Sequence, residues 1–217
     1  MIENIDSYIQ LVLTGICTGI SLYKAFTTRS KAWVLVSLFY SAFFMGSLYW
    51  QLYYVFAGVT PQIFYVSDLS WYISYMFLFL FLRYQRCPDK HLSTCWIKWL
   101  MPVVAGSLCI YYMTFGQIIS NLIAGVLMSL IAMEAVQGLH EIRARSGVCH
   151  PAMKPVYILT LIFFFVEYAL WTSSCIWFDD YSALNPYYYI DMLLSVTLLI
   201  LMPVIGKALD AGKAGSE

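Results

Sequence analysis

Long apolar runs separated by short polar turns dominate the chain. Seven of these runs reach the length of about 20 residues that a helix needs to cross the apolar layer of a membrane. They are Ile5–Phe26, Ala32–Ala57, Phe64–Arg83, Trp96–Phe115, Gln117–Leu139, Pro155–Phe178 and Pro186–Lys207. Because a helix satisfies its own backbone hydrogen bonds inside lipid, we expect an all-α integral membrane protein, a bundle of seven transmembrane helices.

Composition supports a membrane protein and argues against a nucleic-acid partner. Of the 217 residues, 61% are hydrophobic and only 11% are charged, whereas a soluble domain carries about 25% charged residues. Such a chain would expose large apolar patches in water, so the lipid bilayer is its expected partner. The formal net charge is zero, which does not favour binding to a polyanion.

The basic residues predict how the bundle is oriented. In an arrangement of seven spans, all twelve lie on the same side of the membrane. They are Lys24, Arg29, Lys31, Arg83, Arg86, Lys90, Lys98, Arg143, Arg145, Lys154, Lys207 and Lys213. Cytoplasmic loops are enriched in Lys and Arg, so we expect the N-terminus outside and the C-terminus in the cytoplasm of a multi-pass cell-membrane protein. Residues 1–207 would form the transmembrane domain and residues 208–217 a short cytoplasmic tail.

Acidic and aromatic side chains gather toward the expected outer ends of several runs. Asp68, Trp71, Tyr72 and Tyr75 share one face of the third run, since their spacing is i, i+3, i+4 and i+7. Similar stripes occur in the second, sixth and seventh runs. The candidate ligand-binding residues are Asp68, Trp71, Tyr75, Gln51, Tyr54, Glu167, Trp171 and Asp191.

A carboxylate in hydrocarbon is costly, by roughly 2.5–3.5 kcal/mol for Asp on insertion scales, so it needs compensation. No basic residue lies in the outer halves of the runs to pair with Asp68, Glu167 or Asp191. Protonation, hydrogen bonds from Tyr and Trp, or an external cation remain as explanations. We therefore expect an outward-facing cavity for a small cationic or amphipathic ligand. Alternatively, Asp68 and Asp191 lie at the headgroup level within an ordinary aromatic belt.

Three further patterns have simpler explanations. Cys87-x3-His91-x3-Cys95, with Cys149-His150, has zinc-ligand chemistry, but Pro88 interrupts the helix that the spacing requires, so we expect no metal and no cofactor. Gly15-x3-Gly19 suits close packing of the first helix within the bundle. The stripe Glu134, Gln137 and Glu141 is typical of a solvated helix end, paired with Arg143 or Arg145, or else of a surface that passes a signal inward.

One segment resembles a known family. Trp50 to Tyr75 reads W-x2-YY-x3-G-x2-P-x6-D-x2-W-x3-Y, which resembles the second and third helices of the bacterial seven-helix sensory domains of many membrane diguanylate cyclases and some histidine kinases. Val66-Ser67 stands where that family usually has Ser-Leu-Ala. Those domains are fused to an output module. The resemblance implies a sensor that signals to a separate cytoplasmic protein, or the sensory part of a longer chain.

The sequence therefore favours a receptor-like, non-enzymatic membrane protein that binds a small ligand. It contains no nucleophile elbow, phosphate loop or dinucleotide fingerprint. A small-molecule or proton-coupled transporter is the alternative, with Glu167 and Asp191 as proton or cation carriers. Transporters favour helices broken near the membrane centre, and prolines and glycines are scarce there in this chain. A structural subunit of a larger membrane complex is the third hypothesis.

Overall fold

The described part of the chain is helical throughout. The structure is a computed structural model that describes residues 2–59, 61, 66–86, 95–144, 151–177 and 184–214. These residues form seven α-helices and two short 3-10 segments, η1 (Trp96–Trp99) and η2 (Pro151–Met153). The α-helices are α1 (Ile2–Thr28), α2 (Lys31–Ala57), α3 (Val66–Tyr84), α4 (Leu100–Met113), α5 (Ile118–Ala144), α6 (Lys154–Ile176) and α7 (Pro186–Ala214).

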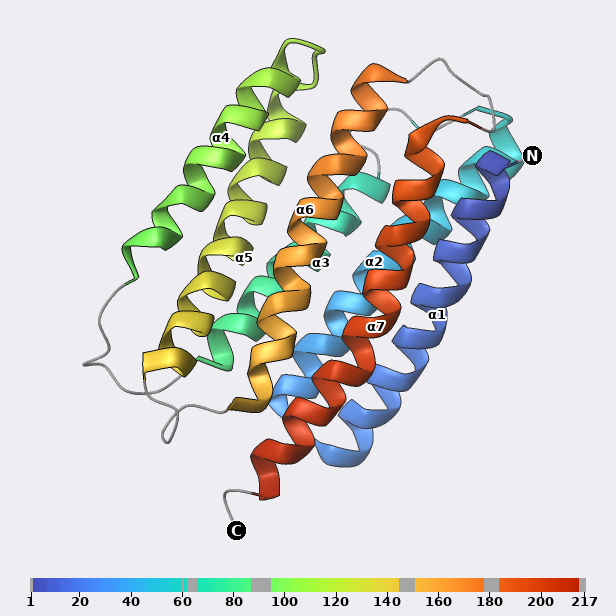
Figure 1. Ribbon diagram of the computed structural model, residues 1–217. Helices are drawn as coiled ribbons and strands as arrows, with labels where there is room; N and C mark the ends of the chain where they lie inside the picture. Colours follow the sequence, from blue (N-terminus) through green and yellow to red (C-terminus); the bar gives the residue numbers. More distant parts are fainter. Residues whose placement is uncertain are drawn as a thin grey trace.

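Six of the helices form a closed ring, and α4 lies outside it. Going round, α1 packs on α2, α2 on α3, α3 on α5, α5 on α6, α6 on α7, and α7 returns to α1. Helix α4 packs mainly on α5 and touches α6 only slightly, and it lies at one edge of the bundle (Figure 1). The helices run alternately up and down, with the two termini at opposite ends (Figure 1).

Six helical segments are long and apolar enough to cross a membrane. They contain α1, α2, η1 with α4, α5, η2 with α6, and α7. Helix α3 is not among them, because its 19 described residues include Asp68 and three serines. The all-helical architecture expected from the sequence is therefore confirmed, and its six long apolar helices are compatible with the expected lipid bilayer. The seventh crossing and the orientation remain predictions.

Helix boundaries follow local chemistry. Helix α2 ends at Gly58, which adopts a left-handed backbone (φ +70°) and donates its N–H to Tyr54 O. Glycine adopts this conformation without the steric cost that a Cβ brings. Helix α7 continues to Ala214, so most of the segment expected as a tail extends the last helix. Pro203 lies inside that helix.

The interior of the ring is filled largely by aromatic side chains. Tyr40 on α2 is fully buried, and its hydroxyl donates to Leu198 O of α7 at 2.8 Å. Phe163 on α6 packs edge-on against Tyr75 of α3, with ring centroids 5.9 Å apart. At Gly46 the indole of Trp71 lies directly against helix α2, because a Cβ there would be 2.6 Å from Trp71 Nε1. This close approach fixes the position of α3 beside α2.

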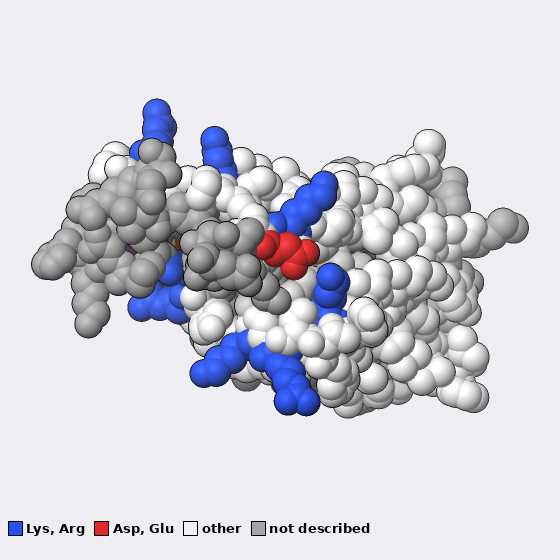
Figure 2. Space-filling view, turned by 90° about the horizontal axis from the view of Figure 1, so that it is seen from below, with Lys and Arg blue, Asp and Glu red and all other residues white. Residues whose placement is uncertain are grey.

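The two ends of the bundle differ in charge. The described Lys and Arg residues lie near the ends of the helices that meet at the C-terminal end of the molecule. Several blue side chains lie over the left and middle of this face when it is viewed along the bundle (Figure 2). We call this the basic end and the other the acidic end, because Asp6, Asp68 and Asp191 lie within the terminal turns there.

Candidate ligand site in the acidic half of the bundle

A buried acid in the middle part of α6 is held by a tyrosine from another helix. Glu167 on α6 is only 2% exposed, and its Oε1 accepts a 2.9 Å hydrogen bond from the hydroxyl of Tyr75 on α3. Lys154, the basic residue of the same helix, is about 20 Å away along the helix axis. The carboxyl group is therefore compensated by a neutral donor and not by a basic side chain of its own helix.

A second buried acid connects three helices through one amide. Asp191 on α7 is 6% exposed and accepts a 2.8 Å hydrogen bond from Gln10 Nε2 of α1. The other atom of that amide, Gln10 Oε1, accepts a 3.0 Å bond from the Ser47 hydroxyl of α2. Gln10 itself is 8% exposed. This bridge ties α1, α2 and α7 together in the acidic half of the ring.

The two acids belong to one acidic cluster that also includes Asp6. Asp191 lies near Glu167, and Asp6 lies near Asp191. Tyr187, one turn before Asp191 on α7, lies near all three carboxyl groups. Asp6 is 1% exposed, and its Oδ1 accepts the Ser7 N–H at 2.7 Å. Residues from α1, α3, α6 and α7 thus converge in a single buried acidic region.

Several buried polar atoms in this half have no hydrogen-bond partner among the described residues. They are Gln51 Oε1, Ser67 Oγ, Trp71 Nε1 and Ser195 Oγ. Buried polar groups are nearly always paired with protein, water or ligand, and leaving one unpaired costs about 1–3 kcal/mol. Ser195 is one helical turn beyond Asp191, and Gln51 is one turn beyond Ser47. The unpaired atoms of Ser195 and Gln51 are therefore one helical turn from Asp191 and Ser47, which belong to the network of buried acids and their partners.

The residues predicted on one face of α3 contact three different helices. Trp71 packs against Trp50 and Phe43 of α2, with ring centroids 6.0 and 6.5 Å away. Tyr72 forms a hydrogen bond with Ser120 of α5. Tyr75 reaches Glu167 of α6, as described above. The shared face predicted from the sequence is therefore the side of α3 that packs into the bundle.

The other candidate residues have different environments. Gln51 is 5% exposed, whereas Tyr54 and Asp68 are half-buried nearer the acidic end. Trp171 on α6 packs edge-on against Tyr112 of α4, with ring centroids 6.4 Å apart. The structure thus places Trp171 in an aromatic group between α4 and α6, although Glu167 on the same helix bonds to α3.

At the basic end, an ion-pair cluster joins α3 to α5. Arg86 pairs with Glu141 and, at 3.2 Å, with Glu134, and Arg83 also pairs with Glu134 at 3.0 Å. Gln137 Nε2 donates to Glu141 Oε1 at 3.0 Å. Burial lowers the pKa of Arg86, but the bonds to Glu141 and the charges of both acids outweigh burial and raise it. The expected pairing of this stripe with Arg143 or Arg145 is not what the structure shows for Glu134 and Glu141. Arg145 lies outside the described residues.

Two other sequence patterns can be compared with the structure. A Cβ at Gly15 would be 3.1 Å from the ring of Phe44 on α2, whereas one at Gly19 would meet no atom within 4 Å. Gly15 therefore packs within the bundle as expected. Of the possible zinc ligands, Cys95 is described, and its backbone N–H donates to Gln137 Oε1 at 2.9 Å. The remaining possible ligands, Cys87, His91, Cys149 and His150, lie outside the described residues.

Sequence reasoning missed two members of the acidic cluster. Asp6 is not among the candidate residues named from the sequence, yet it is buried near Asp191. Gln10 is also absent from the candidate residues, although its amide bridges Asp191 and Ser47. The available signal was the spacing of Asp6, Gln10 and Thr14 at i, i+4 and i+8, which makes one side of an apolar helix polar.

The description of the charged and polar network rests on the sequence and structure of this chain. Comparisons with protein-family models, with curated proteins and with solved structures found no match.

Proposed function

We propose that this chain is a seven-helix membrane sensor with its N-terminus outside. Its outer half binds a small cationic or amphipathic ligand at Glu167 and Asp191, and the bound state is passed to a cytoplasmic partner. The observation that carries the proposal is that both carboxyl groups are buried without a basic partner among the described residues.

Charge balance supports a cationic ligand. Buried charges in proteins are paired, neutralised or bound to a cation. Within the described part of the chain, Glu167 and Asp191 receive hydrogen bonds only from the neutral groups of Tyr75 and Gln10. A ligand ammonium group would supply the missing positive charge. A ligand whose ammonium group carries N–H, such as spermidine, would also satisfy acceptors such as Gln51 Oε1, which has no partner among the described residues.

Aromatic side chains near the acids support the same ligand class. Trp50, Trp71 and Tyr75 lie on α2 and α3, and Tyr187 precedes Asp191 on α7. The faces of such rings attract cations, and their apolar area suits a ligand with a hydrocarbon part. An anionic ligand would meet carboxyl groups and would be repelled.

A signalling path can be drawn along α3. The helix contacts the proposed site through Tyr75, and just beyond its end Arg86 joins α5 at the basic end. A ligand shifts a conformational equilibrium only if it binds one arrangement of the helices more tightly than the other. Ligand binding that alters the Tyr75–Glu167 bond would therefore change how α3 meets α5 at the cytoplasmic face.

The experiment is a thermal-stability screen of purified protein in detergent. Choline, spermidine and dodecyltrimethylammonium are compared with decanoate and glycerol as anionic and neutral controls. We expect a cation to raise Tm, since a ligand at 100 times its Kd stabilises by about 2.7 kcal/mol. Glu167→Gln and Asp191→Asn should remove the shift. Asp210→Asn, an exposed acid at the other end of α7, should keep it. A shift that survives in both site variants, or no shift with any cation, contradicts the proposal.

A transporter is the second candidate, and the polarity of α1 favours it. Asp6, Gln10, Thr14 and Ser21 are buried along one side of this helix, and Asp191 and Ser195 face the interior from α7. Such a stripe could relay protons or a cation. Uptake of a cation into proteoliposomes driven by a proton gradient, lost in Asp191→Asn, would favour this function over sensing.

A further inference from the structure

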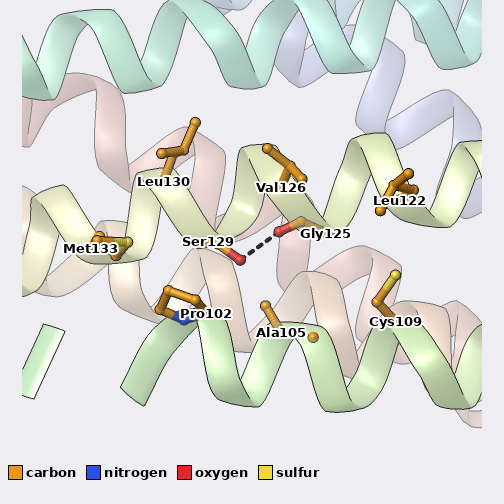
Figure 3. Close-up of a pocket in the computed structure, with 10 residues that line it drawn as sticks. Pro102, Ala105, Cys109, Leu122, Gly125, Val126, Ser129, Leu130 and Met133 are labelled. Atoms are coloured by element: carbon orange, nitrogen blue, oxygen red, sulfur yellow. Dashed lines mark hydrogen bonds between the residues drawn. The ribbon is translucent and has the colours of Figure 1, made fainter. Parts of the chain in front are cut away.

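An apolar groove lies on the far side of the bundle from the acidic cluster. It has a volume of about 330 Å³ and lies between α4 and α5. Its walls are Pro102, Ala105, Gly106 and Cys109 of α4, and Leu122, Gly125, Val126, Ser129, Leu130 and Met133 of α5 (Figure 3). This volume is at the lower end of the range typical of small-ligand pockets.

Small residues on both helices create the groove. At Gly125 the helices are close, because a Cβ there would be 3.4 Å from Cys109 Cβ. At Gly106 a Cβ would meet no atom within 4 Å, so the space beside this residue is open. Tyr112 fixes the other end of α4, because its hydroxyl bonds to Thr172 and Tyr168 of α6. Helix α4 is thus anchored at one end and leaves a gap beside α5.

The groove offers hydrocarbon contacts and no free polar group. The Ser129 hydroxyl donates to Gly125 O of its own helix at 2.6 Å (Figure 3). The Cys109 thiol contacts Asn121 O at 3.4 Å. Leu122 and Val126 are each 52% exposed on helices apolar enough to cross a membrane. In a bilayer, an apolar gap of this kind borders acyl chains.

Positive charge and tryptophan mark the basic end of the same helix. Lys98 precedes Pro102 by one turn, and its Nζ lies 5.7 Å from the centre of the Trp99 ring. Trp96 and Trp99 are 72% and 59% exposed. Tryptophan favours the headgroup level of a membrane, and each Lys near an anionic lipid surface contributes about 1 kcal/mol of attraction. A lipid headgroup beside Lys98 would place its acyl chain alongside α4.

We propose that the α4–α5 groove binds one acyl chain of an anionic phospholipid, whose headgroup contacts Lys98. We choose a lipid as the occupant because the groove is apolar and its Ser129 hydroxyl and Cys109 thiol already have hydrogen-bond partners. The groove is also open at the surface of two helices apolar enough to cross the bilayer. This inference does not depend on the ligand of the acidic cluster, since the lining residues of the groove and of the cluster are different.

The test uses the full chain in vesicles of phosphatidylcholine that contain phosphatidylglycerol with a photoreactive acyl chain. After irradiation, labelled peptides are mapped by mass spectrometry. We expect labels on the segments 102–109 and 122–133. Gly106→Leu fills the open space and should reduce this labelling about fivefold or more, with a smaller reduction for Gly106→Ala. Gly19→Leu is the matched control, because its Cβ also meets no atom within 4 Å, on α1.

Lys98→Gln tests the headgroup contact separately. It should reduce the preference for labelled phosphatidylglycerol over labelled phosphatidylcholine by about fivefold and leave the labelled segments unchanged. Labels spread evenly over all helices, or labelling of the α4 and α5 segments that is equal in Gly106→Leu and the parent chain, would overturn the proposal. Crosslinks through α4 between two copies of the chain would also overturn the proposal, if Gly106→Leu removes these crosslinks and leaves lipid labelling constant.

Discussion

The hydroxyl of Tyr75 and the carboxyl of Glu167 meet at 2.9 Å across the interior of the ring. They belong to α3 and α6, which both neighbour α5 but are not successive in the ring. A bond between them therefore connects two sides of the bundle directly. It also provides the most specific contact with which to probe the acidic cluster.

A double-mutant cycle should measure this bond. Tyr75→Phe removes the donor and leaves the buried carboxyl of Glu167 short of a partner, so we expect the free energy of unfolding to fall by about 1–3 kcal/mol. In the Glu167→Gln background the same tyrosine change should cost less. Thermal unfolding followed by tryptophan fluorescence would give the coupling energy. Equal costs in both backgrounds would mean that the two side chains do not interact.

The Gln10 bridge predicts a contrast within α1. Gln10→Leu removes both the donor to Asp191 and the acceptor for Ser47, and we expect a loss of about 2 kcal/mol or more. Thr14→Val is the control, because the bonds of the Thr14 hydroxyl to described residues are to Gln10 O and Leu11 O of its own helix. Its cost should stay below about 1 kcal/mol. Unfolding in detergent measures both, and a reversed order would contradict the described bridge.

The close approach of α2 and α3 predicts that Gly46 cannot be enlarged. In Gly46→Ala the new Cβ would lie 2.6 Å from Trp71 Nε1 and 3.0 Å from Ser67 O, so we expect destabilisation by about 1–3 kcal/mol. Gly106→Ala meets no atom within 4 Å and should be neutral or stabilising, since alanine favours a helix by up to about 1 kcal/mol over glycine. Similar Tm values for the two variants would be the unexpected outcome.

The ion-pair cluster predicts unequal roles for two arginines. The Arg86 side chain is 22% exposed and pairs with Glu141, which is 3% exposed. Arg86→Gln leaves that acid without its charged partner, and we expect a loss of about 3 kcal/mol. The Arg83 side chain is 59% exposed, so Arg83→Gln should cost less than about 1 kcal/mol. Chemical or thermal unfolding would measure the loss of stability in each variant. A larger loss for Arg83→Gln than for Arg86→Gln would contradict the prediction that the more buried ion pair contributes more.

The proposed orientation predicts which cysteines react from outside the cell. In a background without the native cysteines, Val59→Cys and Leu184→Cys, at positions 56% and 87% exposed, should react with a membrane-impermeant maleimide on intact cells. Ala211→Cys, exposed at the basic end, should react only after the membrane is permeabilised. Labelling of Ala211→Cys on intact cells would invert the orientation, and labelling of all three would point to a different number of crossings.

The positions of the helices along the chain could be predicted from the sequence, but which helices pack against one another could not. Run lengths fix where α1, α2 and α7 begin within a few residues, because lipid demands helices of a certain length. A run such as α4 is apolar on all sides, so its pattern does not indicate which side packs or that the helix lies outside the ring. That position had to come from the structure.

The candidate site shows the same division. Asp68, Tyr75, Glu167 and Asp191 stand out because acids and tyrosines are rare on apolar helices, and three of them are buried. Spacing on one helix cannot decide between two neighbouring helices, so Trp171 was grouped with Glu167 although it packs beside Tyr112. The pairing of Glu134 and Glu141 with Arg83 and Arg86 was not predicted for the same reason, since bonds between helices depend on which helices become neighbours.

The contact between α1 and α7 has a consequence for biogenesis. Of the described helices, α1 is synthesised first and its neighbour α7 last. Until α7 is made, Gln10 cannot reach Asp191, and the polar side of α1 has to be shielded by other means. A nascent chain stalled before Pro186 should therefore be degraded more readily than one that includes α7, which makes ring closure a checkpoint for assembly.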